Sequence, residues 1–349
     1  MPLLETDYLI IGQGLAGSLL AFELIQRQHK VLVIDNNHVG SSSQVAAGII
    51  NPVTGHRLNL TEGFTPNMAK AQETYGQLEK ALNCQIYREI DQHRLIKNPG
   101  QAEYLKKRLS DPVYNDFLKS TTQKTFKDTR HGVVQVRQTA LVDTKRLLES
   151  IKRWLKDSES YLSGSIDYTA LTPTLTGVSL QGVACQTIEA KYVIFCEGYQ
   201  AINNPWLKDL PFKLSKGEIL TLTNKSQYHT MLSWGRWYVP LTNGLAKLGS
   251  NYAWGDLSLN PSTNIKNKLL SSLDENLTLN AELVDHEVGI RPTTQYRQPF
   301  IGPISGLENA YCFNGFGSKG CLTIPQHAAD LCDFLLNRKP LATEVSKCL

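Results

Sequence analysis

The first 35 residues contain two apolar runs that predict strands and, between them, one helical pattern. Residues 8–11 and 31–34 are apolar throughout, which is typical of strands covered on both faces of a sheet. Residues 18–28 have apolar side chains at helical spacing. This order predicts a βαβ unit with two parallel strands.

The rest of the chain shows both kinds of pattern. Helical spacing is expected in four regions: 65–109 with an interruption at 98–100, 145–156, 265–276 and 325–336. Strands are expected in four others: 131–136, 165–188, 192–195 and 310–313. Asp143 or Thr144 could cap the second helix. Residues 212–253 are rich in strand-forming and aromatic side chains, which favours the antiparallel sheet of a second domain.

Length and composition indicate a globular protein of two domains. The chain has 349 residues, of which 41% are hydrophobic and 19% charged, whereas single cores stop growing near about 250–300 residues. The formal net charge of +4 comes from scattered Lys and Arg without a dense basic cluster. A nucleic-acid partner is therefore disfavoured.

The chain has seven cysteines, which are not spaced as the ligands of a metal site are: Cys84, Cys185, Cys196, Cys312, Cys321, Cys332 and Cys348. Their odd number and spacing predict reduced thiols and no metal. The N-terminus lacks the basic and apolar regions of a signal peptide, and no apolar run approaches the ~18–20 residues of a membrane span. We therefore expect a cytoplasmic protein with no membrane partner.

A glycine triplet, Gly12, Gly14 and Gly17, follows the first strand and opens the first helix. In a dinucleotide-binding turn the first glycine permits the tight turn, the second lets a pyrophosphate approach the backbone, and the third lets helix and strand pack closely. The N–H groups at the helix start, near Leu15 and Ala16, would face the phosphates. The alternative is an ordinary βαβ turn.

Two features beyond the triplet extend this hypothesis. Asp35, at the end of the second strand, could accept hydrogen bonds from ribose hydroxyls. The glycine triplet does not separate NAD from FAD, but residues 41–48 read SSSQVAAG, and such small side chains and hydroxyls would let the backbone pass close to a flavin. A plain Ser/Ala loop is the alternative for this segment.

Five short motifs occur in the order found in the D-amino-acid oxidase superfamily of flavoproteins: the glycine triplet, 42–49, 195–199, 289–293 with 299–302, and 314–320. The chain thus resembles that superfamily over almost its full length, especially the glycine oxidase and sarcosine oxidase branches. The resemblance implies an α/β fold, in which a Rossmann-like FAD-binding domain is interleaved with an α+β substrate domain containing an antiparallel sheet. The implied bounds are 1–85, 135–205 and 305–349 for the FAD-binding domain, and 86–134 and 206–304 for the substrate domain.

The resemblance also implies further FAD-binding residues in three segments: Ser42, Ser43, Ala47, Gly48, Gly198, Gly315, Gly317, Ser318, Lys319 and Gly320. The last of these segments precedes the final helix, whose N-terminus would stabilise negative charge on reduced flavin. For Lys319 a solvated loop lysine is the alternative. Val45 and Ile290 occupy positions that carry covalent attachment in some relatives, so FAD is expected to bind noncovalently.

Three residues are catalytic candidates by the same resemblance. Arg291 would hold a substrate carboxylate with its guanidinium, or form an ion pair between the domains. Lys247 would lie over the flavin and assist oxygen reduction, or simply face outward. Tyr238 would line the substrate pocket, or pack in the core. Ser318 replaces a second arginine of glycine oxidase, which puts glycine itself in doubt as the substrate.

The implied activity is oxidation of a C–N bond in an amine or amino acid, by hydride transfer to flavin N5. Oxygen or another electron acceptor would then reoxidise the flavin. Two alternatives are an oxidase acting on a modified tRNA nucleoside and an FAD-binding subunit of a heteromeric dehydrogenase. His56 and Arg57 have no counterpart in the resemblance. They could reach either substrate or cofactor, and their roles stay open.

Overall fold

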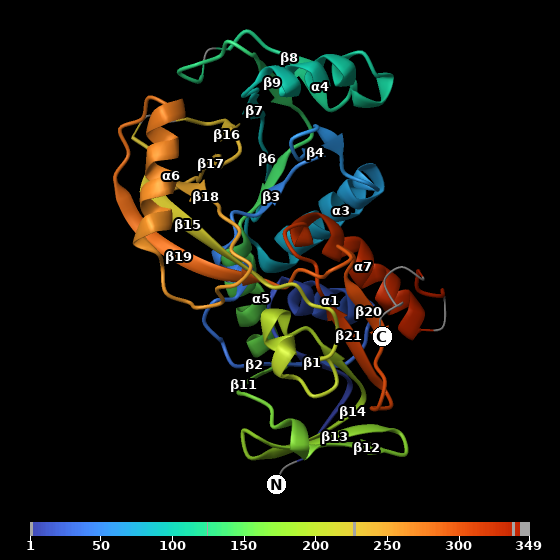
Figure 1. Cartoon of the computed structure of the whole chain (residues 1–349). Helices are drawn as coiled ribbons and strands as arrows, with labels where there is room; N and C mark the ends of the chain where they lie inside the picture. Colours follow the sequence, from blue (N-terminus) through green and yellow to red (C-terminus); the bar gives the residue numbers. More distant parts are fainter. Residues whose placement is uncertain (1–2, 124, 226–227, 337–338, 343–349) are drawn as a thin grey trace.

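The chain folds around two large sheets, the first low in Figure 1 and the second at its upper left. The computed structural model describes residues 3–123, 125–225, 228–336 and 339–342. Cys348 lies outside the described residues, as do the first two and last seven residues of the expected FAD-binding domain.

Strand β1 (Leu3–Ile11) lies in the middle of the first sheet, between two parallel neighbours. These are β2 (Val31–Asp35) and β14 (Gln186–Phe195). Helix α1 (Leu15–Gln26) connects β1 to β2. Consecutive residues from Tyr8 to Ile11 belong to separate buried clusters on the two faces of the sheet, which explains why this part of β1 is apolar at every position. The expected βαβ unit is confirmed.

The first sheet has eight strands, and helices cover one of its faces. The other strands are β11 (Tyr161–Ser163), β12 (Leu171–Thr174), β13 (Gly177–Val183), β20 (Phe300–Pro303) and β21 (Ala310–Asn314). The helices that share a core with α1 are α3 (Phe64–Leu82), α5 (Thr144–Asp157) and α7 (Gly320–Leu335). Strand β21 pairs in parallel with β14, so a C-terminal segment completes a sheet begun by the N-terminus.

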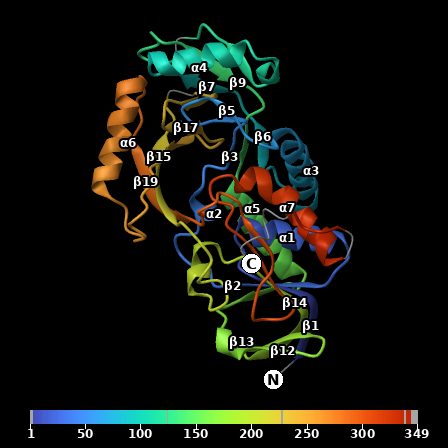
Figure 2. The same cartoon turned by 45° about the vertical axis from the view of Figure 1, so that its right-hand side comes forward.

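The second sheet also has eight strands and is antiparallel apart from one pair, β7 with β16. Its order is β19 (Leu283–Arg291), β15 (Ser215–Thr223), β18 (Leu245–Gly249), β17 (Trp237–Pro240), β16 (Met231–Ser233), β7 (Gln92–Leu95), β9 (Val133–Val136) and β8 (Leu118–Ser120). Helix α6 (Thr263–Asn276) stands against β15 and β19 in Figure 2. It buries Leu269 and Leu273 in the same cluster as Leu248 of β18.

Smaller elements join the two sheets and cover their ends. They are α2 (Ser42–Val45), β3 (Ile49–Ile50), β4 (Val53–Thr54), β5 (Asn59–Leu60), β6 (Tyr87–Glu89), α4 (Pro99–Leu109), β10 (Ala140–Val142), and the 3-10 turns η1 (Pro112–Tyr114), η2 (Tyr168–Ala170) and η3 (Gly198–Asn203). Parallel strands with helices on one sheet, and an antiparallel second sheet, confirm the expected α/β fold class.

The expected helix over 65–109 is wrong in its middle part. Helix α3 ends at Leu82, where Asn83 has a left-handed φ of 47°, a conformation that ends helices. Strands β6 and β7 follow. Asn98 and Pro99 start α4 rather than interrupting a helix, because the Asn98 side chain accepts a hydrogen bond from the Gln101 N–H and Pro99 occupies the first turn.

The expected helix over 325–336 begins five residues earlier, at Gly320 of α7. Pro325 lies inside this helix and has no N–H to donate to the carbonyl of Cys321. The hydroxyl of Tyr75 donates to that carbonyl instead, at 2.8 Å. A side chain 246 residues away in sequence therefore makes the proline tolerable, which no local pattern could indicate.

The two sheets alternate along the chain. Strands of the first sheet come from residues 3–35, 161–195 and 300–314, and strands of the second from 92–136 and 215–291. The interleaved domain bounds stay a prediction, since sheet membership does not define where a domain ends. The expected bound at 135 falls inside β9, which pairs within the second sheet.

Candidate active site

A cavity of about 450 Å³ lies where the two sheets meet. Its walls come from the start of α1, residues 41–51, the turn after β14, strands β15 and β19, and residues 314–324. Binding sites for small molecules and cofactors typically measure about 300–1,000 Å³. The cavity is therefore the candidate active site.

Most residues expected at a cofactor or substrate line this cavity: Gly14, Leu15, Ala16, Ser42, Ser43, Ala47, Gly48, Gly198, Arg291, Gly317, Ser318, Lys319 and Gly320. Others do not line it: Gly12, Gly17, Asp35, Tyr238, Lys247 and Gly315. The structure thus brings segments from all parts of the chain to one place.

The three glycines of the N-terminal motif have different surroundings. Gly12 has a φ of 103°, and a Cβ there would lie 2.6 Å from the carbonyl oxygen of Cys196, so only glycine fits. A Cβ on Gly17 would collide with the backbone of Gly12. A Cβ on Gly14 would meet only the hydroxyl of Ser43, at 3.5 Å. The side of Gly14 that a side chain would occupy is therefore open to the cavity.

The start of α1 faces the cavity with its N–H groups. Leu15 donates its N–H to Ser43 Oγ at 3.1 Å, and the first residues of a helix have further N–H groups without partners in the helix. Together with the helix dipole, these donors form a site suited to a phosphate. Gly14, the residue before the helix, leaves room for such a group.

The carboxylate of Asp35 holds the turn between β1 and α1 on the side away from the cavity. One oxygen of its carboxylate accepts the N–H of Gln13 at 2.8 Å, and the other accepts the N–H of Asn37 at 2.7 Å. The side chain is buried and does not reach the cavity wall. A carboxylate oxygen can accept more than one hydrogen bond, so contact with a ribose hydroxyl stays a prediction.

The segment 41–48 passes along the cavity and is packed closely from behind. Gly48 has a φ of 67°, and a Cβ there would lie 2.8 Å from the carbonyl carbon of Val142. Gly289 of β19 similarly brings its backbone near Ser42 and Val45, where a Cβ would come within 3.3 Å of both. These close approaches fix the path of the backbone at the cavity wall.

The turn before α7 closes the opposite side. Gly315 and Gly317 have φ values of 87° and 55°, which side chains rarely adopt. Asn314 donates its side-chain N–H to the carbonyl of Gly198 at 2.8 Å and so ties this turn to the turn after β14. Lys319 is the residue directly before α7 and lines the cavity, and partial burial lowers the pKa of its ammonium. The helix start therefore presents N–H donors to the cavity, while Lys319 itself is exposed, which leaves the alternative of a solvated loop lysine open.

Arg291 ends β19 and points into the cavity. Its guanidinium donates to Ser250 Oγ at 2.8 Å and to the carbonyl of Asn251 at 3.2 Å. The ring of Tyr252 lies over it, with 4.3 Å between Cζ and the ring centroid. A Cβ on Gly217 of β15 would lie 2.5 Å from Arg291 Cζ, so the guanidinium occupies the space that this glycine leaves free.

The charge of Arg291 has no carboxylate partner in the part of the chain that the structure describes. Among the described residues, no Asp or Glu lies within 4.0 Å of its guanidinium. Burial lowers the pKa of the guanidinium, which nevertheless stays protonated at neutral pH. A half-buried cation that faces a cavity without a counter-ion can bind an anionic ligand group. An ion pair between the domains, the alternative expected from the sequence, is not formed in the described part of the chain.

Lys247 does not reach the cavity. Its ammonium donates to the carbonyls of Val45 at 2.7 Å and Ala46 at 3.2 Å, and it lies 3.8 Å from Glu287 Oε2. Burial lowers the pKa of this ammonium. Lys247 lines a second cavity, of about 480 Å³, and Ala46 and Ala47 line both cavities. The lysine is therefore neither outward-facing nor exposed in the first cavity, and it contacts that cavity's wall from behind.

Tyr238 is fully buried in the core under α6, and its hydroxyl donates to Asn224 Oδ1 at 2.9 Å. Burial raises the pKa of this hydroxyl to about 12. This position favours the core alternative over a place in the substrate pocket. The neighbouring Trp237 lines the cavity instead, because consecutive side chains of a strand point to opposite faces. Within this strand, Trp237 and not Tyr238 therefore faces the cavity.

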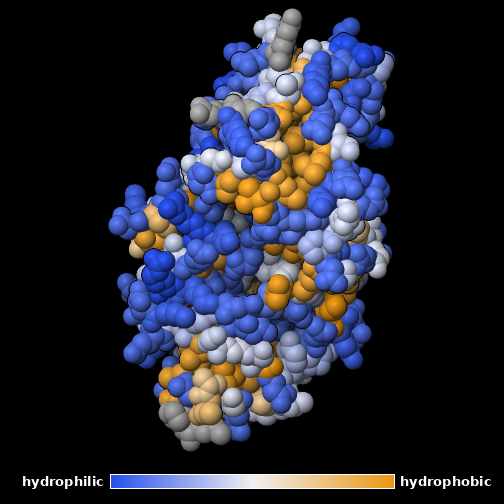
Figure 3. Space-filling model, turned by 90° about the vertical axis from the view of Figure 1, so that its left-hand side faces the viewer, coloured by the Kyte–Doolittle hydropathy of each residue, from blue (hydrophilic) through white to orange (hydrophobic). Residues whose placement is uncertain are grey.

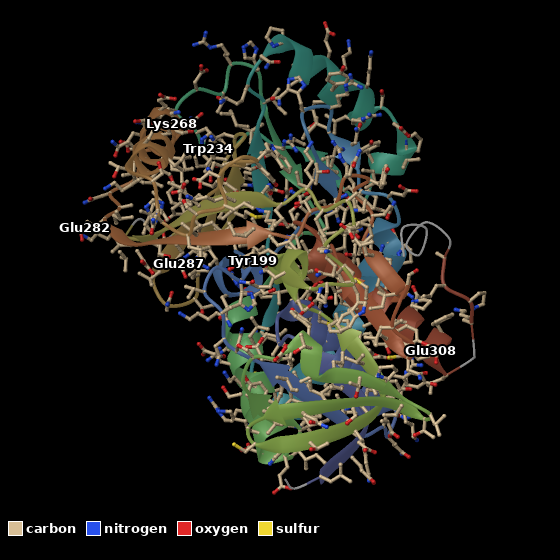
Figure 4. All side chains as sticks on the ribbon, turned by 60° about the horizontal axis from the view of Figure 1, so that its bottom comes forward. Tyr199, Trp234, Lys268, Glu282, Glu287 and Glu308 are labelled. Carbon is tan, nitrogen blue, oxygen red and sulfur yellow. The ribbon has the colours of Figure 1, made fainter. Side chains whose placement is uncertain are left out.

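Glu197 is a cavity residue that the sequence did not single out, although it lies within a recognised motif. It is 7% exposed, accepts hydrogen bonds from Tyr168 Oη at 2.6 Å and from Asn204 Nδ2 at 2.8 Å, and burial raises its pKa to about 7. The next residue but one, Tyr199, also lines the cavity and lies near the end of β19 in Figure 4. Ser250 and Tyr252, beside Arg291, carry no motif that sequence could reveal.

His56 and Arg57 lie outside the cavity. Both are exposed in the turn between β4 and β5, and the His56 ring packs edge-on against Tyr104. Thr54, in the same hairpin, lines the cavity. The hairpin thus contributes to the site through a residue that the sequence did not mark.

The surface in Figure 3 is largely hydrophilic, with separate hydrophobic patches. In the described part of the chain, no helix combines the length and apolar character that crossing a membrane requires. The same residues contain no cluster of three or more His, Cys, Asp or Glu side chains arranged to bind a metal ion. The six described cysteines are free thiols.

A dinucleotide-type turn, an open approach to a helix N-terminus at Gly14 and a cavity at the carboxyl ends of parallel strands are typical of a dinucleotide-binding protein. Comparison with protein families makes this class specific. The model of the FAD dependent oxidoreductase family, DAO, matches residues 7–333. The chain belongs to this family and is an FAD-dependent oxidoreductase.

Individual relatives are distant in sequence. The chain is 23% identical to a glycine oxidase of Pseudomonas putida, over 97% of this chain and 96% of the relative. A solved glycine oxidase from Geobacillus kaustophilus has 19% identity and a TM-score of 0.83, with 98% of each chain covered. A shorter match, 24% identical over 44% of this chain and 28% of the relative, is to the tRNA 5-methylaminomethyl-2-thiouridine biosynthesis bifunctional protein of Nitrosospira multiformis.

Proposed function

We propose that this enzyme oxidises the C–N bond of an amine that carries a carboxylate, such as an amino acid, with noncovalently bound FAD. The observation that carries the proposal is Arg291, a half-buried guanidinium that faces the cavity without an acidic partner in the described chain. Burying a cation alone is costly. A ligand carboxylate would supply the missing counter-charge.

The lining of the cavity fits FAD. Gly14 leaves the approach to the α1 N-terminus open, and the small residues Ala46, Ala47 and Gly48 let a flat ring lie near the backbone. Val45 and Ile290 carry no nucleophile that could form a covalent bond to the cofactor, which supports noncovalent binding. When bound, FAD supplies the hydride acceptor for C–N oxidation.

Arg291 would hold the carboxylate, and its own neighbours would hold Arg291. Ser250 and Asn251 accept hydrogen bonds from the guanidinium, and Tyr252 covers it. The remaining N–H groups of the fork are left for the ligand. Ser318, on the α7 side of the cavity, can offer a hydroxyl but no second positive charge. We therefore propose a substrate with one carboxylate near the amine.

The substrate amine must be neutral before it gives up hydride. Ile219 and Trp237 form apolar parts of the cavity wall, and desolvation beside such groups disfavours the charged ammonium. No dedicated general base is therefore required. The work of the protein in this step is to align the C–H bond with the cofactor.

We also propose oxygen as the electron acceptor, with Lys247 as the supporting residue. The ammonium of Lys247 lies directly behind the wall at Val45 and Ala46, held by their carbonyls. A positive charge directly behind the cavity wall favours a reaction in which oxygen gains negative charge. A quinone or a protein carrier is the alternative acceptor. The free thiols of the described chain support a reducing compartment, and we infer the cytoplasm.

Arg291→Ala tests the proposal. Removing one partner of a buried charge pair costs about 2–5 kcal/mol in binding, so KM for an acidic substrate should rise by roughly 30-fold or more, at 1.4 kcal/mol per factor of ten. Amines without a carboxylate should lose far less. Arg137→Ala, which removes an exposed arginine of the same kind, is the control.

Equal losses for substrates with and without a carboxylate would contradict this role for Arg291. Such a result, together with retention of the protein on tRNA at moderate salt, would favour the tRNA nucleoside instead. Failure of every amine to reduce the bound flavin, with activity appearing only when a neighbouring subunit is added, would favour the heteromeric dehydrogenase.

A further inference from the structure

Residues 250–262, here called the cover segment, leave β18 and run to the start of α6. Its first three residues form the wall around Arg291: Ser250 and Asn251 accept hydrogen bonds from the guanidinium, and Tyr252 stacks on it. The segment contains no helix or strand of its own. Something outside the segment must therefore hold this wall in place.

Lys216 of β15 contacts the cover segment through the ammonium of its side chain. The side chain is 1% exposed, and its ammonium donates to Asp256 Oδ2 at 2.9 Å, Ser258 Oγ at 3.1 Å and the carbonyl of Asn260 at 2.8 Å. All three partners belong to the cover segment. An ammonium has three protons to donate, so every one of them is used on this segment.

The backbone of Lys216 holds the same segment. Its N–H donates to the carbonyl of Ala253 at 2.9 Å, and the Ala253 N–H donates back to its carbonyl at 3.0 Å. Glu218, two residues along β15, adds two more contacts. Its N–H donates to Asn251 Oδ1 at 2.7 Å, and its carboxylate accepts the N–H of Ser262 at 2.8 Å. The cover segment is thus fastened near both ends and in the middle.

Strand β15 connects this fastening to the cavity. Because side chains alternate along a strand, Lys216 and Glu218 point to one face and Gly217 to the other. Gly217 lies under the guanidinium of Arg291. One short stretch of backbone therefore supports Arg291 from below and holds the wall that surrounds it.

We propose that Lys216 is a positioning residue that holds the cover segment against Arg291 and so fixes the geometry of the carboxylate site. This inference rests on the proposed function of Arg291. A buried lysine without partners is strongly unfavourable. Two carboxylates lie within 4.0 Å of the Lys216 ammonium: the buried Glu218 at 3.8 Å, and Asp256 at 2.9 Å, whose side chain is 53% exposed. The geometry explains this choice of partner, because Asp256 brings an otherwise exposed loop down onto the strand.

The test uses Lys216→Met and Asp256→Ala in the full-length holoenzyme. Asp256 is half exposed, so its replacement leaves the core intact even where Lys216→Met folds poorly. In both variants, peptides covering the cover segment should exchange amide hydrogen faster than in the wild type. Phenylglyoxal, which modifies arginine, should react faster with Arg291. Asp256→Asn keeps a hydrogen-bond acceptor and should shift both readings less.

The kinetic readout separates positioning from general damage. Misplacing a binding group by about 1 Å can cost about 100-fold, so KM for a carboxylate-bearing amine should rise roughly 10- to 100-fold with little change in kcat. An amine without a carboxylate, and retention of the flavin, should be unaffected. Lys268→Met, on the exposed side of α6 in Figure 4, and Glu308→Ala are matched controls.

Unchanged exchange and unchanged Arg291 reactivity in both variants would overturn the inference. So would an equal rise in KM for amines with and without a carboxylate. If no carboxylate-bearing amine is a substrate of the wild type, the proposed function fails. The exchange and phenylglyoxal measurements still decide whether Lys216 holds the wall around Arg291.

Discussion

Glu197→Gln should remove a pH dependence of stability that the wild type shows. Burial raises the pKa of Glu197 from its usual 4.5 to about 7, although Tyr168 and Asn204 donate hydrogen bonds that favour the ionised form. The folded protein therefore prefers the protonated carboxyl. This contribution to stability is fully present below the unfolded pKa near 4.5 and is lost as pH rises through the folded pKa near 7.

The magnitude follows from the pKa difference. A rise from 4.5 to about 7 corresponds to about 3 kcal/mol, at 1.36 kcal/mol per pKa unit. At about 2.1 cal/mol/K per residue, a chain of 349 residues has an unfolding entropy of about 0.7 kcal/mol/K, so this energy equals about 4 °C in Tm. Glutamine has a similar shape and no charge, so the variant lacks this term.

The assay is thermal unfolding at several pH values between 4.5 and 8, at one fixed concentration of free FAD. The difference in Tm between Glu197→Gln and wild type should grow by about 4 °C in favour of the variant as pH rises through this range. Glu308→Gln, an exposed glutamate, should follow the wild type. Parallel curves for Glu197→Gln and wild type would refute the argument, because they would mean that this carboxyl titrates equally in the folded and unfolded chain.

Three further predictions concern the cavity. Gly217→Ala should displace the guanidinium of Arg291, since a Cβ would lie 2.5 Å from its Cζ; kinetics should show a raised KM for acidic amines only, and an unchanged KM would place the guanidinium elsewhere. Gly14→Val should leave the fold intact, as only Ser43 lies near, but the purified protein should be colourless; a yellow variant would mean that Gly14 does not face the cofactor. Lys247→Met should slow reoxidation by oxygen by tenfold or more, about 1.4 kcal/mol, with anaerobic flavin reduction little changed in stopped flow; equal slowing of both half-reactions would assign Lys247 to structure alone.

The sequence pattern predicted the N-terminal βαβ unit, because the residues that form it lie close together in the sequence. Consecutive apolar residues, three glycines and an acidic residue at the end of the second strand fall within 35 residues, and each has a direct physical reason. Arg291 also followed from a short motif, and the structure places it in the cavity. The predicted helix over 325–336 was wrong at its start, because a distant residue, Tyr75, makes Pro325 tolerable inside the helix.

The rest of the site depends on which face of a strand is buried and on long-range contacts. The resemblance pointed to the strand of Tyr238 but could not indicate which side chains of that strand face the cavity. Trp237 faces it, whereas Tyr238 lies in the core. Lys247 was expected over the cofactor, whereas it binds the carbonyls of the wall from behind. The sequence alone does not indicate a role for Lys216, because a lysine within a strand has no recognisable motif and its partner Asp256 lies 40 residues later.

The proposed activity of this FAD-dependent enzyme is the oxidation of an amine that bears a carboxylate. The most direct measurement is anaerobic addition of single amino acids and secondary amino acids to the purified holoenzyme, each paired with its decarboxylated analogue, while the flavin absorbance is recorded. The account predicts that at least one acid bleaches the flavin rapidly and that its decarboxylated partner does not. Bleaching by both members of a pair to the same extent, or by no acid at all, would contradict it.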